Sequence, residues 1–130
     1  MDILGFEKLI YHRDKLDSLA RNKPQFPIHA TVSLGNYCNH KCLWCTAYEY
    51  QLDKARMIDF DSLLNWLTRA RDRGLKAIGY VGNGEPTTYP RFAELVHAVN
   101  GLGLQQGMFT NAYLLDRYEQ EILDCFTYLR

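Results

Sequence analysis

Short apolar segments alternate with helical patterns along most of this chain, and this alternation limits the folds that it can adopt. Residues 28–34, 76–81, 104–109 and 127–130 are typical of strands, whereas the segments from about 60, 90 and 116 carry apolar residues at helical spacing. A strand, helix, strand order favours parallel strands joined by helical crossovers. The pattern therefore predicts an α/β fold with one parallel sheet.

Polar and special residues mark where the predicted helices begin and end. Asp59 or Asp61 lies near the start of the first crossover helix, and Gly74 lies just past its end. Pro90 suits the start of the second crossover helix, and Gly101 suits a left-handed cap at its end.

A third crossover helix is predicted to begin near Asp116, whose side chain would cap it, with Glu119 three residues further on. The apolar face of this helix would contain Leu115, Tyr118, Ile122 and Cys125.

The number of repeats suggests part of a larger barrel. A closed eight-stranded α/β barrel takes about 250 residues, whereas this chain has 130 and stops inside a predicted strand. We therefore expect parallel (β/α) units forming part of a TIM-like barrel, truncated after three and a half repeats. This barrel part would occupy residues 28–130, and residues 1–27 would form an N-terminal helical extension, helical from Ile3 to Ala20, and a linker.

The charge distribution argues against some classes of partner. Lys and Arg number 15, Asp and Glu also number 15, and the net charge is zero without any basic run. Nucleic acid is therefore an unexpected partner. No apolar stretch reaches the roughly 18 to 20 residues that a bilayer span needs, and the start lacks the pattern of a signal peptide, so the expected location is the cytoplasm without a membrane partner.

Three of the four cysteines, Cys38, Cys42 and Cys45, lie within eight residues. A disulfide framework would scatter its cysteines, whereas a metal needs several thiolates at one point. A buried helical stripe would give the same spacing, but the surrounding Gly, Asn and Lys residues favour a loop. Three thiolates suit a zinc site with His40 as the fourth ligand, or an iron-sulfur cluster with one iron left open.

Two further polar motifs directly follow predicted strands. They are Gly82-Asn83-Gly84-Glu85 and Thr110-Asn111. Because the carboxyl ends of parallel strands lie at one edge of a sheet, both motifs are expected beside the cysteines. Asn-Gly is also a common turn, and a polar pair after a strand is often simple turn chemistry, so each motif alone has an ordinary structural interpretation.

Taken together, the motifs resemble those of the radical S-adenosylmethionine (SAM) superfamily. Its signature is Cys-x3-Cys-x2-Cys after the first strand, commonly with an aromatic residue before the third cysteine, which here is Trp44. The resemblance extends from about Ile28 to Arg130 and includes a Gly-Gly-Glu-like motif after the second strand. Asn83 departs from that motif at its middle position, where its tolerance of left-handed backbone angles would preserve the turn.

The resemblance implies a set of cofactor contacts. Cys38, Cys42 and Cys45 would hold a 4Fe-4S cluster, and the amino and carboxylate groups of SAM would occupy the fourth iron. The motif formed by Gly82, Asn83, Gly84 and Glu85 would bind the methionyl ammonium group. Thr110 and Asn111 would contact the ribose or methionine part of SAM, and Trp44 would shield the cluster, adjoin the adenine or pack in the core.

The resemblance also implies a reaction. An electron from an external donor of the flavodoxin or ferredoxin type would cleave SAM reductively to a 5′-deoxyadenosyl radical, which abstracts hydrogen from an unidentified substrate. The chain alone would be incomplete and inactive, because an unclosed barrel leaves the radical open to solvent.

Two alternatives from other classes remain at this point. One is a non-catalytic zinc-binding or interaction module that uses Cys38, Cys42, Cys45 and His40. The other is an electron carrier, which would need Cys125 as a fourth cluster ligand.

Overall fold

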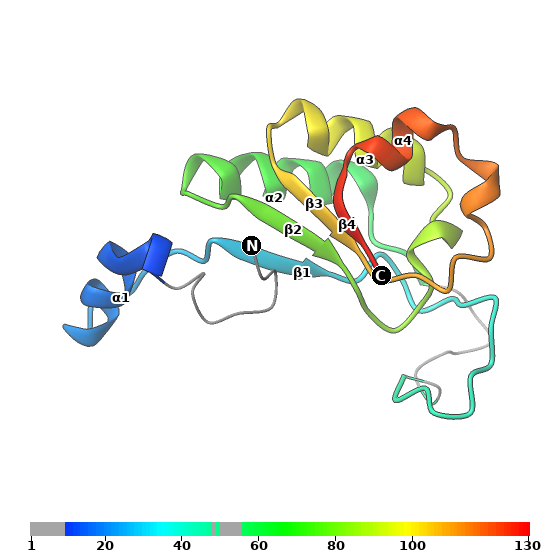
Figure 1. The fold of residues 1–130 in the computed structure, drawn as a ribbon, viewed down its shortest axis with the longest axis horizontal. Coiled ribbons are helices and arrows are strands. Elements are labelled where there is room, and N and C mark those ends of the chain that lie inside the picture. The colour runs from blue at the N-terminus through cyan, green and yellow to red at the C-terminus, as the bar shows by residue number, and fades with distance from the viewer. Residues whose placement is uncertain (1–9, 48, 50–55) are drawn as a thin grey trace.

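The sheet is parallel, as the alternation of elements predicts. The computed structural model describes residues 10–47, 49 and 56–130 (Figure 1). Its four strands lie side by side in chain order: β1 (His29–Val32), β2 (Ala77–Tyr80), β3 (Gln105–Met108) and β4 (Phe126–Leu129). The β1, β2 and β3 registers are regular, and the β3 to β4 register shifts between Gln106 and Gly107. This arrangement confirms the predicted α/β class.

Helices cover one face of the sheet (Figure 1). The described helices are α1 (Arg13–Ala20), α2 (Phe60–Asp72), α3 (Phe92–Gly101) and α4 (Gln120–Asp124), with short 3₁₀ turns η3 (Pro86–Thr88) and η4 (Leu115–Arg117). The covering helices are α2, α3 and α4, whereas α1 contains no buried residue. The predicted helical extension is observed from Arg13, and its proposed start at Ile3 lies outside the described residues.

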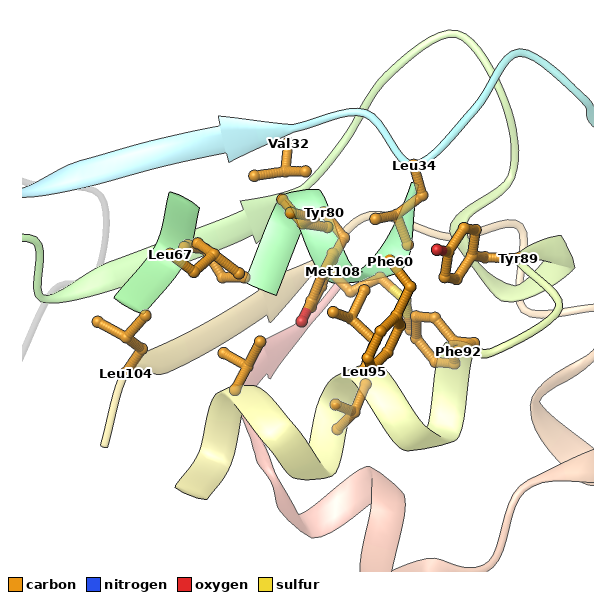
Figure 2. Packing of buried hydrophobic residues seen from close by; sticks show 14 of the residues in the cluster. Val32, Leu34, Phe60, Leu67, Tyr80, Tyr89, Phe92, Leu95, Leu104 and Met108 are labelled. Atoms are coloured by element: carbon orange, nitrogen blue, oxygen red, sulfur yellow. The ribbon is translucent and has the colours of Figure 1, made fainter. Parts of the chain in front are cut away.

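The core lies between the sheet and these helices. Tyr80 of β2 and Met108 of β3 point toward Leu67 of α2 and Leu95 of α3, and all four side chains are fully buried (Figure 2). Burial of large apolar side chains contributes about 1.5–3 kcal/mol each, so this layer supplies most of the stabilisation of the sheet.

One hydrogen-bonded pair crosses the core. The Tyr80 hydroxyl donates to Gln106 Oε1 at 2.6 Å, and Gln106 Nε2 donates to the Val96 carbonyl at 3.0 Å. Burial raises the pKa of Tyr80 far above its ordinary value, so the hydroxyl stays a donor. The pair therefore satisfies both buried polar side chains and joins β2, β3 and α3.

The ends of α2 follow the prediction. Asp59 is the N-cap and accepts a hydrogen bond from the Ser62 amide at 2.9 Å, and Gly74 has a positive φ of 108° just past the helix. The prediction for α3 is wrong at its end, because Gly101 is helical and Gly103 has the left-handed φ of 72°. The helix runs one residue further than expected, with Leu102 as its C-cap.

The predicted third helix is interrupted. Tyr118 has extended backbone angles between η4 and α4, and Asp116 makes no capping hydrogen bond. The Tyr118 hydroxyl donates to the Thr87 carbonyl at 2.7 Å, and its ring packs edge-on against Phe92. This anchoring outweighs local helix propensity, although Ile122 is buried as expected.

No helix in the described part of the chain is long and apolar enough to cross a bilayer.

Candidate functional site

The loops that leave β1, β2 and β3 meet at the edge of the sheet toward which the strands point (Figure 1). We call residues 38–45 the cysteine loop and residues 82–85 the glycine loop. Segments 34–36 and 56–58 pair at the base of the cysteine loop: the Asn36 amide donates to the Arg56 carbonyl at 3.1 Å, and the Ile58 amide donates to the Leu34 carbonyl at 3.0 Å. This pairing joins the loop to the sheet and to the start of α2.

The two glycines of the glycine loop permit close packing. A Cβ on Gly84 would lie 2.3 Å from the Tyr37 carbonyl oxygen, and a Cβ on Gly82 would lie 2.1 Å from Ser33 Oγ. Such distances are too short for any other residue. The Glu85 amide also donates to the Tyr37 carbonyl at 2.9 Å. The glycine loop therefore packs directly against the chain that leads into the cysteine loop.

Asn83 does not need the left-handed angles for which its residue type is suited. Among the described residues, the non-glycine residues with positive φ are Asn22 and Ala112. The Asn83 amide lies 3.4 Å from Ser33 Oγ, and its side chain is on the exposed part of the loop. Glycine is thus needed at positions 82 and 84 because the backbone there lies close to Ser33 and Tyr37, and not because a left-handed turn requires it.

Glu85 is buried, with 6% of its surface exposed, and its carboxylate connects two motifs. Oε1 accepts hydrogen bonds from the Thr87 amide at 3.2 Å and from the hydroxyls of Thr87 and Thr110, each at 2.6 Å. Oε2 accepts a hydrogen bond from the Asn111 amide at 2.9 Å. Charge-assisted bonds of this kind compensate for burying the carboxylate and hold the glycine loop against the end of β3.

Asn111 continues this path to the cysteine loop. Its Oδ1 accepts a hydrogen bond from the Tyr113 amide at 3.0 Å, and its Nδ2 donates to Asn39 Oδ1 at 2.9 Å. The same Nδ2 lies 4.0 Å from Cys38 Sγ. The turn places Ala112 in the left-handed region, with a φ of 63°, which is an unfavourable conformation for alanine.

The thiols are placed differently from one another. Cys38 is half-buried and its Sγ accepts from the His40 amide at 3.4 Å, whereas Cys42 is exposed. The Cys45 amide donates to the Cys42 carbonyl at 3.1 Å in a tight turn. In the described ranges, no three His, Cys, Asp or Glu side chains converge closely enough to hold a metal ion.

Trp44 lies on the surface of the cysteine loop, with 89% of its surface exposed. The alternative in which this residue packs in the core is therefore wrong. An exposed indole beside the thiols offers a flat apolar surface to a bound molecule.

The residues on which the two alternatives depend are engaged elsewhere. The His40 ring packs edge-on against Tyr113, and only its backbone amide contacts Cys38. Cys125 lies between α4 and β4, at the opposite edge of the sheet, and its Sγ donates to the Glu121 carbonyl. Burial raises the pKa of the Cys125 thiol, with Glu121 and Asp124 adding to the effect.

Sequence patterns did not identify two residues of this network. Thr87 supplies two donors to Glu85, and Asn39 joins the cysteine loop to Asn111. Asn39 could have been found from the sequence, because its amide side chain directly follows Cys38 and the cysteines were expected at the same edge of the sheet as Asn111. No local pattern marks Thr87, because its role depends on how the η3 turn folds back.

The residue types at this edge suit an iron-sulfur cluster, in which each thiolate binds a different iron and the thiolates need not converge on one ion. Three thiols share one loop, and Asn39 Nδ2 is a buried donor without a partner in the described part of the chain. Thiolates are the ligands of such clusters, and N–H groups commonly donate to their sulfur atoms. The carbonyl oxygens of Gly82, Asn83 and Gly84 accept no hydrogen bond within the described residues, so they are open to an ammonium group.

Known proteins resemble this chain in sequence and in fold. The sequence profile of the Radical SAM superfamily matches residues 32–127, so the chain belongs to that superfamily. A curated relative from Pyrococcus furiosus, the tungsten-containing aldehyde ferredoxin oxidoreductase cofactor-modifying protein, is 37% identical over 85 residues, which cover 65% of this chain.

Solved structures share the fold. Streptococcus suis SuiB bound to precursor peptide SuiA matches 98% of this chain with a TM-score of 0.70 and 27% identity. BtrN in complex with AdoMet and 2-DOIA matches 78% of this chain and 44% of its own, with a TM-score of 0.62 and 16% identity. The present chain spans 24% of the curated relative and 29% of the SuiB chain.

Proposed function

We propose that this chain holds a 4Fe-4S cluster through Cys38, Cys42 and Cys45 and binds SAM beside it, as part of a radical SAM enzyme. Residues 28–130 would be the N-terminal part of the barrel, and residues 1–27 an extension before it. When bound, the cluster supplies the electron that cleaves a carbon–sulfur bond of SAM. An external donor of the flavodoxin or ferredoxin type would supply that electron to the cluster.

The observation that carries this proposal is the hydrogen-bonded path from Glu85 through Asn111 to Asn39 and Cys38. Three motifs from three separate loops are connected by side chains at one edge of the sheet. A turn needs no such connections, and each one fixes a group that the proposed chemistry uses. The path therefore supports one common site over three independent turns.

Each part of the edge has a role in the proposal. The Gly82, Asn83 and Gly84 carbonyls, which accept no hydrogen bond among the described residues, accept the methionyl ammonium of SAM, and Glu85 Oε2 adds negative charge nearby. Glu85 holds the Thr110 side chain and the Asn111 backbone at the end of β3, beside the place proposed for the ribose or methionine part of SAM. Trp44 is the apolar surface for the adenine or the shield for the cluster.

The test is anaerobic reconstitution of the purified chain with iron and sulfide, followed by elemental analysis and by electron paramagnetic resonance (EPR) after reduction. We expect about four irons and four sulfides per chain and a spectrum that changes when SAM is added. A single zinc ion per chain would instead support the zinc-binding module. A chain that stays colourless would contradict the proposal.

A further inference from the structure

Asn39 and Asn111 form a hydrogen-bonded amide pair, and Asn111 Nδ2 lies 4.0 Å from Cys38 Sγ. We infer that the two side-chain amides donate hydrogen bonds to sulfur at the Cys38 corner of the cluster and raise its reduction potential. This inference rests on the proposed function, because it assumes that Cys38 holds the cluster.

The orientation of both amides follows from the hydrogen-bond network. The Tyr113 backbone amide can only donate, so the atom of Asn111 that it contacts at 3.0 Å must be the oxygen. Nδ2 of Asn111 is therefore on the side of Asn39 and Cys38 and donates to Asn39 Oδ1 at 2.9 Å. Asn39 consequently has its own Nδ2 left over as a donor.

Both amides have a donor that protein oxygens do not use. One Asn111 Nδ2 proton goes to Asn39, and the other is available to Cys38 Sγ at 4.0 Å. Asn39 Nδ2 is buried and unpartnered, and it is the one such side-chain nitrogen or oxygen within the described residues. Leaving a buried donor unsatisfied is unfavourable, and Asn39 directly follows the proposed ligand Cys38 in the chain, so a sulfur atom of the cluster is the acceptor that this donor lacks.

The network also holds the pair in place. The Asn111 backbone amide donates to buried Glu85, and the Asn39 side chain is held by Asn111. Cys38 receives the His40 amide as well, whereas no hydrogen bond to Cys42 Sγ is found in the described part of the chain. The Cys38 corner is therefore the more strongly hydrogen-bonded of these two positions.

Donors to cluster sulfur stabilise the reduced, more negative state and so raise the potential. The experiment compares Asn111→Leu and Asn39→Leu with Asn100→Leu, a matched change on the exposed surface of α3. Each reconstituted chain is analysed for iron and sulfide and then titrated without SAM, with EPR detection of the reduced cluster. We expect lower midpoint potentials for Asn111→Leu and Asn39→Leu and a wild-type potential for Asn100→Leu. Asn111→Asp separates the loss of a hydrogen-bond donor from a change of charge near the cluster. If Asn111→Asp lowers the potential while both Leu variants do not, charge alone is responsible and the inference is wrong.

Wild-type potentials in fully loaded Asn111→Leu and Asn39→Leu chains would also overturn the inference while leaving the proposed function intact. Failure of the wild-type chain to take up iron and sulfide would instead overturn the proposed function and the inference with it. If the variants do not load, the wild-type chain decides: pulsed EPR of protein carrying heavy nitrogen only in asparagine side-chain amides should detect coupling to the cluster. Absence of that coupling contradicts the inference.

Discussion

The glycine loop and the cysteine loop lie at the same edge of the sheet, yet the protein holds them in different ways. Glu85 is buried and accepts hydrogen bonds from three residues, whereas Trp44 and Leu43 have 89% and 85% of their surfaces exposed. The first loop is built by contacts within the chain. The second exposes the Cys42 thiol and apolar surface, which is the arrangement expected where a ligand supplies further contacts. Changes in the two loops should therefore have different consequences.

The largest expected effect belongs to the cysteine loop. Cys42→Ser should reduce iron uptake on reconstitution by more than about tenfold, because changes to outer-shell partners of metal ligands already cost about 10–100-fold. Its free energy of unfolding without the cluster should stay close to wild type, since Cys42 is exposed. Iron analysis and urea denaturation measure the two quantities. Cys125→Ser is the matched control and should load normally, because Cys125 lies at the opposite edge; loss of the cluster in that variant would revive the electron-carrier alternative.

Changes in the glycine loop should instead lower the free energy of unfolding. Gly84→Ala places a Cβ 2.3 Å from the Tyr37 carbonyl oxygen, so the backbone must shift. We expect the free energy of unfolding to fall by about 2–3 kcal/mol, as overpacking does elsewhere. Gly101→Ala is the control, since a Cβ at that position would have no atom within 4 Å and an alanine in a helix should gain about 0.5–1 kcal/mol. Equal urea midpoints for the two variants would show that the loop packs less closely than described.

Glu85→Gln tests whether the carboxylate connects the loops. Gln keeps one acceptor oxygen but turns the other into a donor that faces donors, so the free energy of unfolding should fall by about 2 kcal/mol. Urea denaturation of the chain without cluster gives this value. Glu94→Gln, on the exposed surface of α3, is the control and should change stability little. A Glu85→Gln chain as stable as wild type would mean that the two loops are held by the glycine packing alone.

This contrast also explains how much could be predicted from the sequence. The strands and α2 depend on local patterns and were predicted to within a few residues, and the cap of α2 was one of the two predicted aspartates, Asp59. The break at Tyr118 could not be predicted, because it depends on a carbonyl 31 residues away in the chain. The meeting of the three loops at one edge of the sheet followed from parallel topology. The Glu85 network did not, since it depends on side chains that meet only after the sheet has formed.

The smallest effect is expected at the start of α2, just after the segment 56–58 that pairs at the base of the cysteine loop. The hydrogen bonds from Ser62 lower the pKa of Asp59 below its ordinary value of 3.8, so the charged cap stabilises the folded state. That stabilisation is complete above the unfolded-state pKa and is lost as pH falls through the lower folded-state value. Asp59→Ala should therefore melt at a lower temperature than wild type at neutral pH, and the difference should shrink as the pH falls below 3.8. Asp59→Asn keeps a capping oxygen without the titrating charge and should lose less than Asp59→Ala at neutral pH. Thermal melts across this pH range measure the difference. If the difference between Asp59→Ala and wild type were the same at every pH, the cap would act without its charge and the proposed role of the charged Asp59 would be wrong.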